Sequence, residues 1–358
     1  MSDRIGILVD RLVLHRALRD RPTHEQVSLY REIALAEGID IIVFSINDIS
    51  VRRHSLRGYV PSSQGWQRQA APIPKVIHKR VLYQTNAPLQ ILDTLRRRGT
   101  ILVNPHRMQS KQKMHQILSG SASASGHIPP TWDSCWYQLR RQLDTGHSMI
   151  MKPKIGSVGQ GILKIVPLSK QRVLVTGQST RELSRPALRK HLRTRMSSHR
   201  YLLQQCINLA QYEGRPFDLR VPVQRDGEGN WVVAGMVAKV ATGHPFLTNL
   251  AQGGHAMPGE NAIKAAFAPS ISAVLPERII RLAFDVAQAV AGHYHYAADL
   301  GLDVGIDTDG KPWLIEVNTR DQRITFLQAG LHDEFRTLYT NPIAYCSHLN
   351  QKLSTPER

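Results

Sequence analysis

The sequence has few cysteines and no long apolar run. Its three cysteines, Cys135, Cys206 and Cys346, lie far apart and form no Cys-x-x-Cys pair, which argues against a zinc site and against a disulfide framework. No apolar stretch is long enough to span a lipid bilayer. Charged residues interrupt the apolar ones in the N-terminal segment MSDRIGILVDRLVLHRALRD, as they do not in a signal peptide. We therefore expect a cytoplasmic protein without a membrane span.

Acidic residues are scarce beside basic ones. The 358 residues include 46 Lys and Arg but 28 Asp and Glu, which gives a net charge of +18, and so basic a chain attracts polyanions of any kind. Aromatic residues, which stack on bases in nucleic-acid binders, make up only 6% of the sequence. We therefore expect a nucleotide, an acidic substrate or an anionic polymer as a partner rather than a specific nucleic acid.

The densest basic run extends from Arg185 to Arg200 and reads RPALRKHLRTRMSSHR. Its residues Arg185, Arg189 and Arg193 recur at intervals of four and therefore share one face of a helix. A solvated helix face and a dedicated binding surface both account for this pattern.

The first hundred residues alternate short β-like runs with helical stretches. The runs are IGILV, IDIIVFS, PKVIHKRV and TILVN, and the helical stretches are THEQVSLYREIALAEG and NAPLQILDTLRRRG. This alternation is typical of a parallel sheet with crossover helices. Thr23 to Gln26 has the form of a capping box, which predicts a helix start there. No GxGxxG follows the first run, so a dinucleotide site has no support.

Composition changes twice along the rest of the chain. A polar helix, QSKQKMHQIL, and a flexible Gly/Ser-rich connection precede three short strands and the basic helix, which together predict a small antiparallel unit. Longer β segments (YLLQQCI, FDLRVPVQR and NWVVAGMVAKVA), a long helix, a strand pair and a last helix, NPIAYCSHLNQKL, follow. We therefore expect domains at 1–104, 105–200 and 201–350, with a C-terminal tail at 351–358.

A glycine-rich turn, MKPKIGSVGQGI, interrupts the small antiparallel unit. Gly156, Gly159 and Gly161 have no side chains that would keep an oxyanion away from backbone N–H groups, and Lys152 and Lys154 add positive charge. No GK[ST] follows, so the turn is not a Walker A loop. A phosphate cradle and a tight hairpin that needs positive φ both explain the glycines.

The segment LDVGIDTDGKPWLIEVNTRD carries acidic residues in two apolar runs. Glu316 and Asn318 are two apart and leave the same face of one strand, while Asp303 lies on the preceding strand. The Asp-Gly turn between the runs predicts antiparallel neighbours. Two carboxylates and an amide oxygen suit Mg²⁺, and the alternative is that nearby arginines such as Arg320 or Arg323 neutralise the carboxylates.

A third group of charges lies on two further strands. Asp218 and Arg220 leave one face of FDLRVPVQR, and Lys239 lies on the next strand, so Arg220 and Lys239 could neutralise a phosphate during transfer. The loop TNLAQGGHA is expected to act as a mobile lid. Exposed charges without a role are the alternative.

Five of these motifs, KPKIGSVGQGI, FDLRV, NLAQGGHA, GLDVGID and LIEVNT, occur in an order that resembles the ATP-grasp superfamily. The match is to its glutathione-synthetase-like branch and covers roughly residues 105 to 350. The segments FSINDISVRRHSLRGYV and PIPKVIHKRV look similar to the leading domain of the endospore coat-associated YheC/YheD type, although only Arg80 is retained from that family's polar set. The resemblance implies an ATP-grasp fold, α+β, in which two α+β subdomains clasp ATP behind a Rossmann-like pre-ATP-grasp α/β domain.

The resemblance also implies which residues bind ATP. Lys111 and Lys152 would reach the phosphates. The segment Gln204 to Ile207 would be the adenine hinge, with main-chain groups of Gln205 and Ile207 on the base, and Asp218 would meet the ribose. The residues of the loop that covers the phosphates would be Gly156, Ser157, Gly159 and Gly161.

Metal and catalytic residues follow in the same way. Asp303, Glu316 and Asn318 would hold two Mg²⁺ ions, which Mn²⁺ could replace. The residues that would face the transferred phosphate or the acceptor carboxylate are Arg220, Lys239 and Asn249.

The resemblance implies an ATP-dependent carboxylate–amine ligase that acts through an acyl phosphate and releases ADP and phosphate. No protein nucleophile is needed, because positioning, metal and cationic side chains suffice. The acid and the amine are not identified, although the basic helix suggests an anionic or polymeric acceptor. The alternative is an ATP-binding structural or assembly protein of the spore coat that does not turn over.

Overall fold

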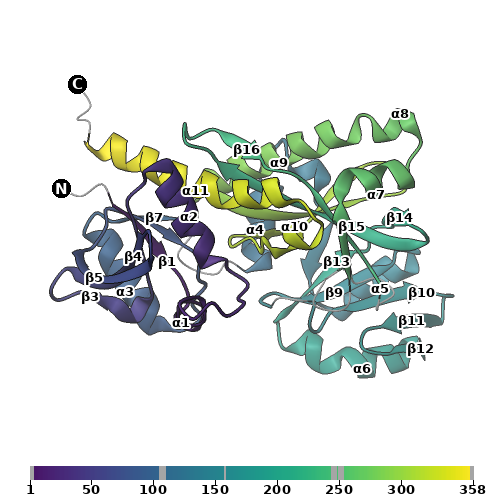
Figure 1. Cartoon of the computed structure of the whole chain (residues 1–358). Coiled ribbons are helices and arrows are strands. Elements are labelled where there is room, and N and C mark those ends of the chain that lie inside the picture. Colours follow the sequence, from purple (N-terminus) through teal and green to yellow (C-terminus); the bar gives the residue numbers. More distant parts are fainter. Residues whose placement is uncertain (1–3, 105–109, 157–158, 243–247, 249–253, 355–358) are drawn as a thin grey trace.

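The structure is a computed structural model that describes residues 4–104, 110–156, 159–242, 248 and 254–354. Three β-sheets follow one another along the chain, and helices cover them (Figure 1). None of the helices in these residues has the length and apolar character that spanning a membrane requires.

The first sheet has four parallel strands at its centre, in the order β2-β1-β6-β7. Strands β1, β2 and β6 are buried along their whole length, as parallel strands with both faces covered should be. The strands are β1 (Ile5–Leu8), β2 (Ile41–Phe44), β3 (Ile49–Ser50), β4 (Ser55–Ser62), β5 (Gly65–Pro72), β6 (Val76–Lys79) and β7 (Ile101–Val103). The helices are α1 (Arg11–Ala17), α2 (Val27–Glu37), the 3-10 helix η1 (Ile46–Asp48) and α3 (Asn86–Arg97).

The predicted alternation of strands and helices is therefore confirmed, but the sequence analysis missed the antiparallel hairpin of β4 and β5. This hairpin extends the sheet beyond β2, so the Rossmann-like description of the unit stays a prediction. The predicted capping box is wrong. Helix α2 begins at Val27, and its cap residue Gln26 makes no side-chain hydrogen bond to the helix. The backbone N–H of Gln26, which a capping box would join to Thr23, donates instead to the hydroxyl of Tyr339, 2.9 Å away.

The second sheet is antiparallel throughout, as predicted, in the order β12-β11-β10-β9-β13-β8. Its strands are β8 (Thr131–Asp133), β9 (Met149–Pro153), β10 (Leu163–Pro167), β11 (Arg172–Thr176), β12 (Thr180–Ser184) and β13 (Tyr201–Gln205). The neighbouring helices are α4 (Lys111–Ser119), the 3-10 helix η2 (Ser125–His127), α5 (Trp136–Asp144) and α6 (Arg185–Ser197). The Gly/Ser-rich connection expected to be flexible contains η2, and Ala124 at its start is fully buried against the third sheet.

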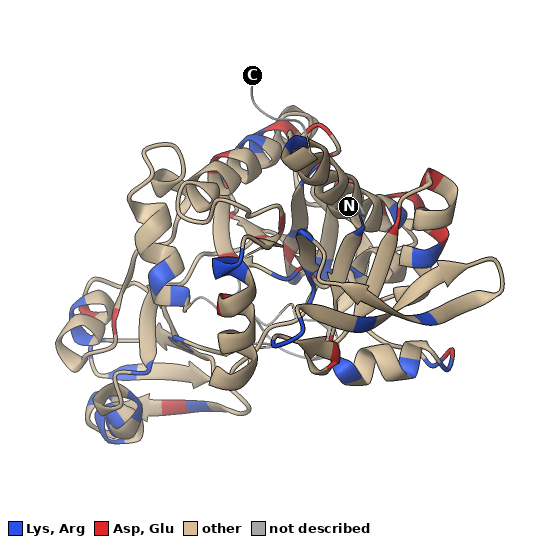
Figure 2. Ribbon diagram, turned by 90° about the vertical axis from the view of Figure 1, so that its left-hand side faces the viewer, with Lys and Arg blue, Asp and Glu red and all other residues tan. Residues whose placement is uncertain are grey.

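Helix α6 is the predicted basic helix, and Figure 2 shows its Lys and Arg residues gathered at the bottom edge of the molecule. It buries Leu188 and Leu192 against the second sheet. Arg189 is exposed, but its guanidinium also lies 5.8 Å from the ring centre of Trp136. Arg185 reaches Asp144 at 3.6 Å. One face of α6 is therefore partly used in packing.

The third sheet has β18-β17-β15-β19-β20 as its main path, with antiparallel neighbours. Its strands are β14 (Gln211–Tyr212), β15 (Arg215–Arg225), β16 (Trp231–Val233), β17 (Val237–Val240), β18 (His255–Pro258), β19 (Asp299–Ile306) and β20 (Pro312–Asn318). The helices are α7 (Gly259–Ala266), α8 (Pro269–Ser272), α9 (Leu275–Ala291), α10 (Ile324–Gln328) and α11 (His332–Ser354).

Two predictions about this part are corrected. The segment NWVVAGMVAKVA forms two strands, β16 and β17, which pair with different parts of β15, because Gly235 between them has φ of +156°. The last helix begins at His332, nine residues before the predicted start at Asn341. Pro342, the second residue of the predicted helix, therefore lies inside the observed one.

Helix α11 joins the first and third sheets. It contacts α2, β1 and β6 of the first unit and also β15 of the third, and in Figure 1 it runs in yellow from one unit to the other. Its residues Leu338, Tyr339 and Ile343 share one apolar core with Ile5 and Ile7 of β1. The C-terminal helix therefore fixes the first sheet against the third.

Four charged side chains are buried at this junction, each at most 3% exposed: Glu25, Arg80, Asp299 and Arg323. They are termed the junction network. Arg80 donates to Glu25 at 2.9 Å and to Asp299 at 2.8 Å, and Arg323 donates to Asp299 at 2.7 Å. Burial alone would raise the pKa of Glu25, but the charges of Arg80 and Arg323 outweigh it and lower the pKa to about 2. The network therefore stays ionised at neutral pH.

Candidate functional site

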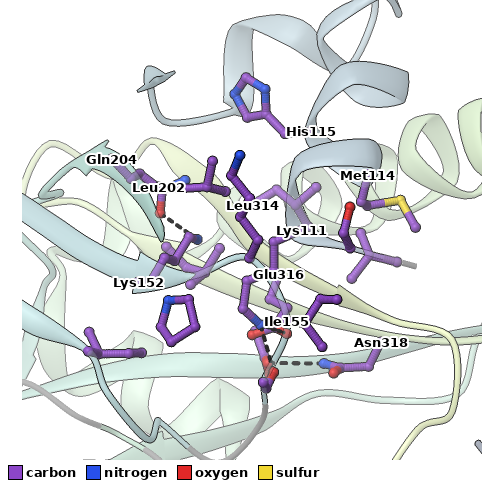
Figure 3. Close-up of a pocket in the computed structure, with 18 of the residues that line it drawn as sticks. Lys111, Met114, His115, Lys152, Ile155, Leu202, Gln204, Leu314, Glu316 and Asn318 are labelled. Carbon is purple, nitrogen blue, oxygen red and sulfur yellow. Dashed lines mark hydrogen bonds and ion pairs between the residues drawn. The ribbon is translucent and has the colours of Figure 1, made fainter. Parts of the chain in front are cut away.

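The hairpin of β19 and β20 brings together the three residues expected to hold a metal. Asp303 lies opposite Glu316 in the strand register, and the register shifts directly after Asp303. The amide nitrogen of Asn318 donates to Asp303 Oδ2 at 3.2 Å, an interaction drawn as a dashed line in Figure 3. The alternation of side chains along a strand and the Asp-Gly turn account for this convergence.

Two cations meet Asp303, one from β15 and one from β17. Arg220 Nε donates to Asp303 Oδ1 at 3.0 Å, and Lys239 Nζ donates to the same oxygen at 2.7 Å. Arg220 is the register partner of Asp303 across β15 and β19. Burial would raise the pKa of Asp303, but the charges of Arg220 and Lys239 lower it well below its ordinary value. Asp303 is therefore a carboxylate at neutral pH.

Lys239 also pairs with Asp218, its register partner across β15 and β17. Its Nζ lies 3.0 Å from Asp218 Oδ1, and Thr248 donates its hydroxyl to Asp218 Oδ2 at 2.7 Å. Burial raises the pKa of Asp218, and the charge of Lys239 opposes that shift. One lysine therefore bridges the residue expected at the ribose and the residue expected at the metal.

Two further lysines, Lys111 and Lys152, lie near Glu316. Lys111, at the start of α4, forms an ion pair with Glu316 and donates to the carbonyl of Gly156 at 3.2 Å. Lys152 on β9 donates to Gln204 Oε1 at 2.8 Å, and Figure 3 shows both lysines directed into the same cavity. Burial lowers the pKa of Lys152 to about 8, with the charge of Glu316 acting against it. Lys152 remains largely charged at neutral pH.

The glycine-rich turn between β9 and β10 lies beside these lysines. Gly156 and Gly159 line the cavity. Gly161 does not line it; its φ is +74°, and a Cβ there would lie 3.2 Å from Pro153. Gly161 is therefore explained by the geometry of the turn rather than by contact with a ligand. Ser157 lies outside the described residues.

The expected hinge, Gln204 to Ile207, begins with the last two residues of β13. Gln204 accepts from Lys152 and donates to Thr131 Oγ1 at 2.9 Å. The backbone N–H of Gln205 donates to the carbonyl of Pro130 at 2.9 Å, so this group already has a partner. Ile207 lines the cavity beside it.

Two adjoining cavities connect these groups. One of about 210 Å³ extends from the glycine turn to Asn318 and Arg320, and one of about 310 Å³ extends from the hinge to Asp218 and Thr248. Both are lined by the same four charged residues: Lys111, Lys152, Asp303 and Glu316. The cavities therefore form one cleft between the second and third sheets.

The chemistry of the donor set fits a magnesium ion. Asp303 and Glu316 provide carboxylate oxygens, and Asn318 provides an amide oxygen, which are hard ligands of the kind that Mg²⁺ prefers. No group of three His, Cys, Asp or Glu in the described ranges is placed to hold a metal, and the expected set has only two such residues. In the structure, lysine and arginine side chains neutralise both carboxylates. These ion pairs mark where Asp303 and Glu316 need positive charge.

Every expected residue that the structure describes, except Gly161, lines this cleft. Asn249 and most of the expected lid loop lie outside the described residues. The alternative reading of the carboxylates named the wrong arginines: Arg323 pairs with Glu25 and Asp299, and Arg320 pairs with neither Asp303 nor Glu316 among the ion pairs of the described residues. Arg220, Lys239 and Lys111 neutralise the carboxylates instead.

The sequence analysis missed Asp321. This carboxylate is fully buried and accepts from Arg220 Nη1 at 2.7 Å, so it holds Arg220 from the side opposite Asp303. Arg80 of the junction network donates to the main-chain carbonyl of Asp321 at 2.8 Å. A Cβ on Gly301 would collide with the Asp321 carboxylate. Such a close approach between residues twenty positions apart leaves no periodic pattern in the sequence.

The chain is similar to known proteins over most of its length. Residues 99–349 match the family described as YheC/D like ATP-grasp. Two relatives from Bacillus subtilis (strain 168) align over most of the chain. Endospore coat-associated protein YheD is 21% identical over 331 residues, which are 88% of this chain and 72% of that protein. Endospore coat-associated protein YheC is 24% identical over 324 residues, which are 87% of this chain and 88% of that protein.

Solved structures with the same fold include three ligases or synthetases. The ATP-grasp ligase PsnB, in complex with a minimal precursor, has a TM-score of 0.54 and 16% identity and covers 94% of this chain and 99% of its own. The VanG D-Ala:D-Ser ligase from Enterococcus faecalis has a TM-score of 0.54 and 12% identity, with 97% and 100% covered. D-cycloserine synthetase DcsG has a TM-score of 0.52 and 13% identity, with 98% and 99% covered.

These structures share the fold with the chain, and the family match extends over well over half of its length. The protein belongs to the YheC/D-like ATP-grasp family and has the ATP-grasp fold.

Proposed function

We propose that the protein is an ATP-dependent ligase that joins a carboxylate to an amine through an acyl phosphate. The observation that carries the proposal is one cleft that gathers four cationic side chains around the carboxylates of Asp303 and Glu316. Phosphoryl transfer needs little covalent help from a protein, because positioning and neutralisation of charge provide most of the catalysis.

The residues of the chain have separable tasks in this proposal. Lys111 and Lys152 bind the phosphates of ATP under the glycine-rich turn. The carbonyl of Gln205 and the main chain of Ile207 bind adenine, and Asp218 binds the ribose. Because Lys152 is buried beside Gln204, it is held in place before the nucleotide arrives.

Arg220, Lys239 and Asn249 face the phosphoryl group as it is transferred to the acceptor carboxylate. Arg220 keeps its orientation because its Nη1 donates to the carboxylate of Asp321 at 2.7 Å. Preorganised positive charge of this kind stabilises the charge that develops in the transition state. Two Mg²⁺ ions, or Mn²⁺, held by Asp303, Glu316 and Asn318, would supply Lewis acidity and neutralise phosphate oxygens.

The comparisons support a ligase, since PsnB and VanG are named as ligases and one PsnB structure contains Mg and ADP. We further propose the division into domains at 1–104, 105–200 and 201–350. The three sheets support it except that β13 (Tyr201–Gln205), which the division assigns to the third domain, belongs to the second sheet. An anionic or polymeric acceptor is suggested by the exposed cations of α6. A place of action in the cytoplasm or at the spore coat rests on the names of the two relatives.

Phosphate release from ATP and Mg²⁺, measured alone and with pools of amino acids, short peptides and other carboxylates, tests the proposal. We expect one pool to stimulate release. Glu316→Gln should abolish stimulation, because it removes a carboxylate from the expected metal site. Glu260→Gln is the matched control, because Glu260 is an exposed residue that pairs with Lys264 in the same helix.

Equal stimulation in the wild type and Glu316→Gln would contradict the site. Tight binding of ATP without release under any pool would contradict the ligase and favour the alternative, a nucleotide-dependent assembly role. Failure to bind ATP would contradict both functions.

A further inference from the structure

Three polar side chains, Thr131, Lys152 and Gln204, lie together on the wall of the cleft. Gln204 on β13 lies opposite Thr131 on β8 and Ile150 on β9 in the strand register, and Lys152 lies two residues after Ile150. Opposite residues of antiparallel strands share a face of a sheet, as do residues two apart on one strand. These side chains therefore leave the second sheet on the same side, and Thr131, Lys152 and Gln204 line the cavity of about 210 Å³.

Three hydrogen bonds link these residues in series. Lys152 Nζ donates to Gln204 Oε1 at 2.8 Å, a bond drawn as a dashed line in Figure 3. Gln204 Nε2 donates to Thr131 Oγ1 at 2.9 Å, and Thr131 Oγ1 donates to the carbonyl of Pro129 at 2.8 Å. Lys152 and Gln204 are each 7% exposed, so water has little access to these groups.

The charge of Lys152 fixes the direction of every bond in the series. An ammonium group donates and never accepts, so the end of the Gln204 amide that faces Lys152 is its oxygen. The other end is the NH₂ group, which only donates, and Thr131 has to accept from it. The single hydroxyl proton of Thr131 is then left for Pro129. Reversing the amide would place its NH₂ group against the ammonium ion and turn the Thr131 proton away from Pro129.

The fixed amide presents an acceptor to the cleft. A carbonyl oxygen has two lone pairs, and Lys152 uses one of those on Gln204 Oε1. Gln204 lines both cavities, and Ile150, Ile162 and Ile315 give the second one apolar walls that suit the faces of a purine. The 6-amino group of adenine donates to such an acceptor. The 6-oxo group of hypoxanthine or guanine is itself an acceptor, so it makes no hydrogen bond there.

We propose that Thr131 is a specificity-determining residue of the nucleotide site, because it holds the Gln204 amide with its oxygen toward the cleft and so selects a 6-amino purine over a 6-oxo purine. Thr131 acts through Gln204 and is therefore a positioning residue. That the cleft binds a purine nucleotide rests on the proposed function; the fixed amide rests on the three hydrogen bonds.

A purely structural role for Thr131 makes a different prediction. Thr131→Val keeps the shape of the side chain but leaves the NH₂ group of Gln204 without an acceptor, so the free energy of unfolding decreases under either role. If Thr131 only supports the sheet, the affinities for all nucleotides change by the same factor. If Thr131 fixes the amide, the released amide can offer its NH₂ group to a 6-oxo purine, and the preference for the 6-amino purine declines.

The test is isothermal titration calorimetry of the full chain with Mg²⁺ and either ADP or IDP, which differ at position 6 of the base and in the proton on N1. The contribution of N1 cancels when the ratio of the two affinities is compared between variants. We expect the wild type to prefer ADP and Thr131→Val to reduce that preference by about tenfold, the effect of roughly one hydrogen bond. Thr131→Ser retains the hydroxyl and should keep the preference.

Thr176→Val is the matched control. Thr176 lies on β11 of the same sheet, is also 7% exposed and accepts from the hydroxyl of Thr180 at 3.4 Å, but it lines neither cavity. This variant should keep the ratio of the wild type. A second comparison uses Gln204→Glu, because both ends of a carboxylate accept and its direction needs no support. In that background Thr131→Val should leave the preference for ADP unchanged.

The proposal would be overturned by equal affinities of the wild type for ADP and IDP, by an unchanged ratio in Thr131→Val, or by the same loss of preference in the Gln204→Glu background. Thermal melting checks that each variant folds. Should Thr131→Val not fold, Gln204→Met, which removes the amide itself, has to lose the preference, and retention of it would also contradict the proposal.

The same titrations separate this proposal from the proposed function. If neither nucleotide binds to the wild type, the proposed function fails and the specificity assigned to Thr131 fails with it. If both nucleotides bind but their ratio does not depend on Thr131, only the specificity is wrong.

Discussion

The junction network and the cleft use the same kinds of side chain in opposite ways. In the junction network every charge is matched, the four side chains are at most 3% exposed, and Arg80 and Arg323 share Asp299. In the cleft, Glu316 is 32% exposed and its partner Lys111 is 15% exposed. The ion-pair distances in the two regions are similar, but only the ion pairs of the cleft border a cavity.

This difference teaches which charges a ligand can reach. A buried and fully paired network adds little net stability over apolar packing, yet removing one member leaves an uncompensated charge and is severe. Charges beside a cavity can exchange their partners for those of a ligand. The junction network is therefore expected to set the arrangement of the first and third sheets, and the cleft to bind and react.

The largest expected effect is that of breaking the junction network. Asp299→Ala leaves Arg80 and Arg323 without their shared carboxylate, and we expect a loss of about 3–5 kcal/mol in the free energy of unfolding. Glu316→Gln, in the partly exposed cleft, should lose no more than about 1 kcal/mol. Urea denaturation measures both, and similar losses in the two variants would remove the distinction between the regions.

The junction network should also determine how the free energy of unfolding responds to acid. The pKa of Glu25 is lowered from 4.5 to about 2 in the folded protein, so the unfolded chain takes up a proton first as the pH falls. The stability due to Glu25 is therefore complete above pH 4.5 and lost progressively down to about pH 2, by roughly 3 kcal/mol.

Glu25→Gln removes this titrating group. Denaturation is measured between pH 5 and pH 2, roughly the window of that titration. As the pH decreases, the free energy of unfolding should fall less steeply in the variant than in the wild type. Parallel curves would show that Glu25 does not carry the acid response.

A smaller effect should appear where the two regions touch. Asp321 is held at the junction by Arg80 and itself holds Arg220 in the cleft. Asp321→Asn should lower the kcat of the proposed ligase by about tenfold, or roughly 1.4 kcal/mol in the barrier, with little change in the KM for ATP, because Arg220 is expected to face the transferred phosphoryl group rather than the nucleotide.

Gly301→Ala should reproduce this split, since its methyl group would displace the Asp321 carboxylate. Gly305→Ala on the same strand is the control, because its methyl group would meet the side chain of Leu209 at 2.5 Å rather than the Asp321 carboxylate. Steady-state kinetics together with thermal melting separate the effects, and an equal loss of kcat in Gly305→Ala would mean that general damage to β19 is responsible.

Several features of the site could be predicted from local sequence patterns. The spacing of Glu316 and Asn318 and the Asp-Gly turn predicted a hairpin with both side chains on one face, and the structure has it. Asp218 and Arg220 on one strand and Lys239 on the next meet as expected. These relations depend on neighbours in sequence or on adjacent strands joined by short turns, so periodicity suffices to find them.

The sequence by itself therefore determined the parallel strands of the first sheet, the antiparallel character of the second unit and the residues that line the cleft. Only the tertiary structure decided which cations neutralise Asp303 and Glu316, and that Asp321 supports Arg220. It also decided that α11 fixes the first sheet to the third and that Glu25, read as part of a capping box, pairs with Arg80 instead. These contacts join residues far apart in the chain, and their selection depends on which charges become buried together, a property of the folded packing that no local spacing encodes.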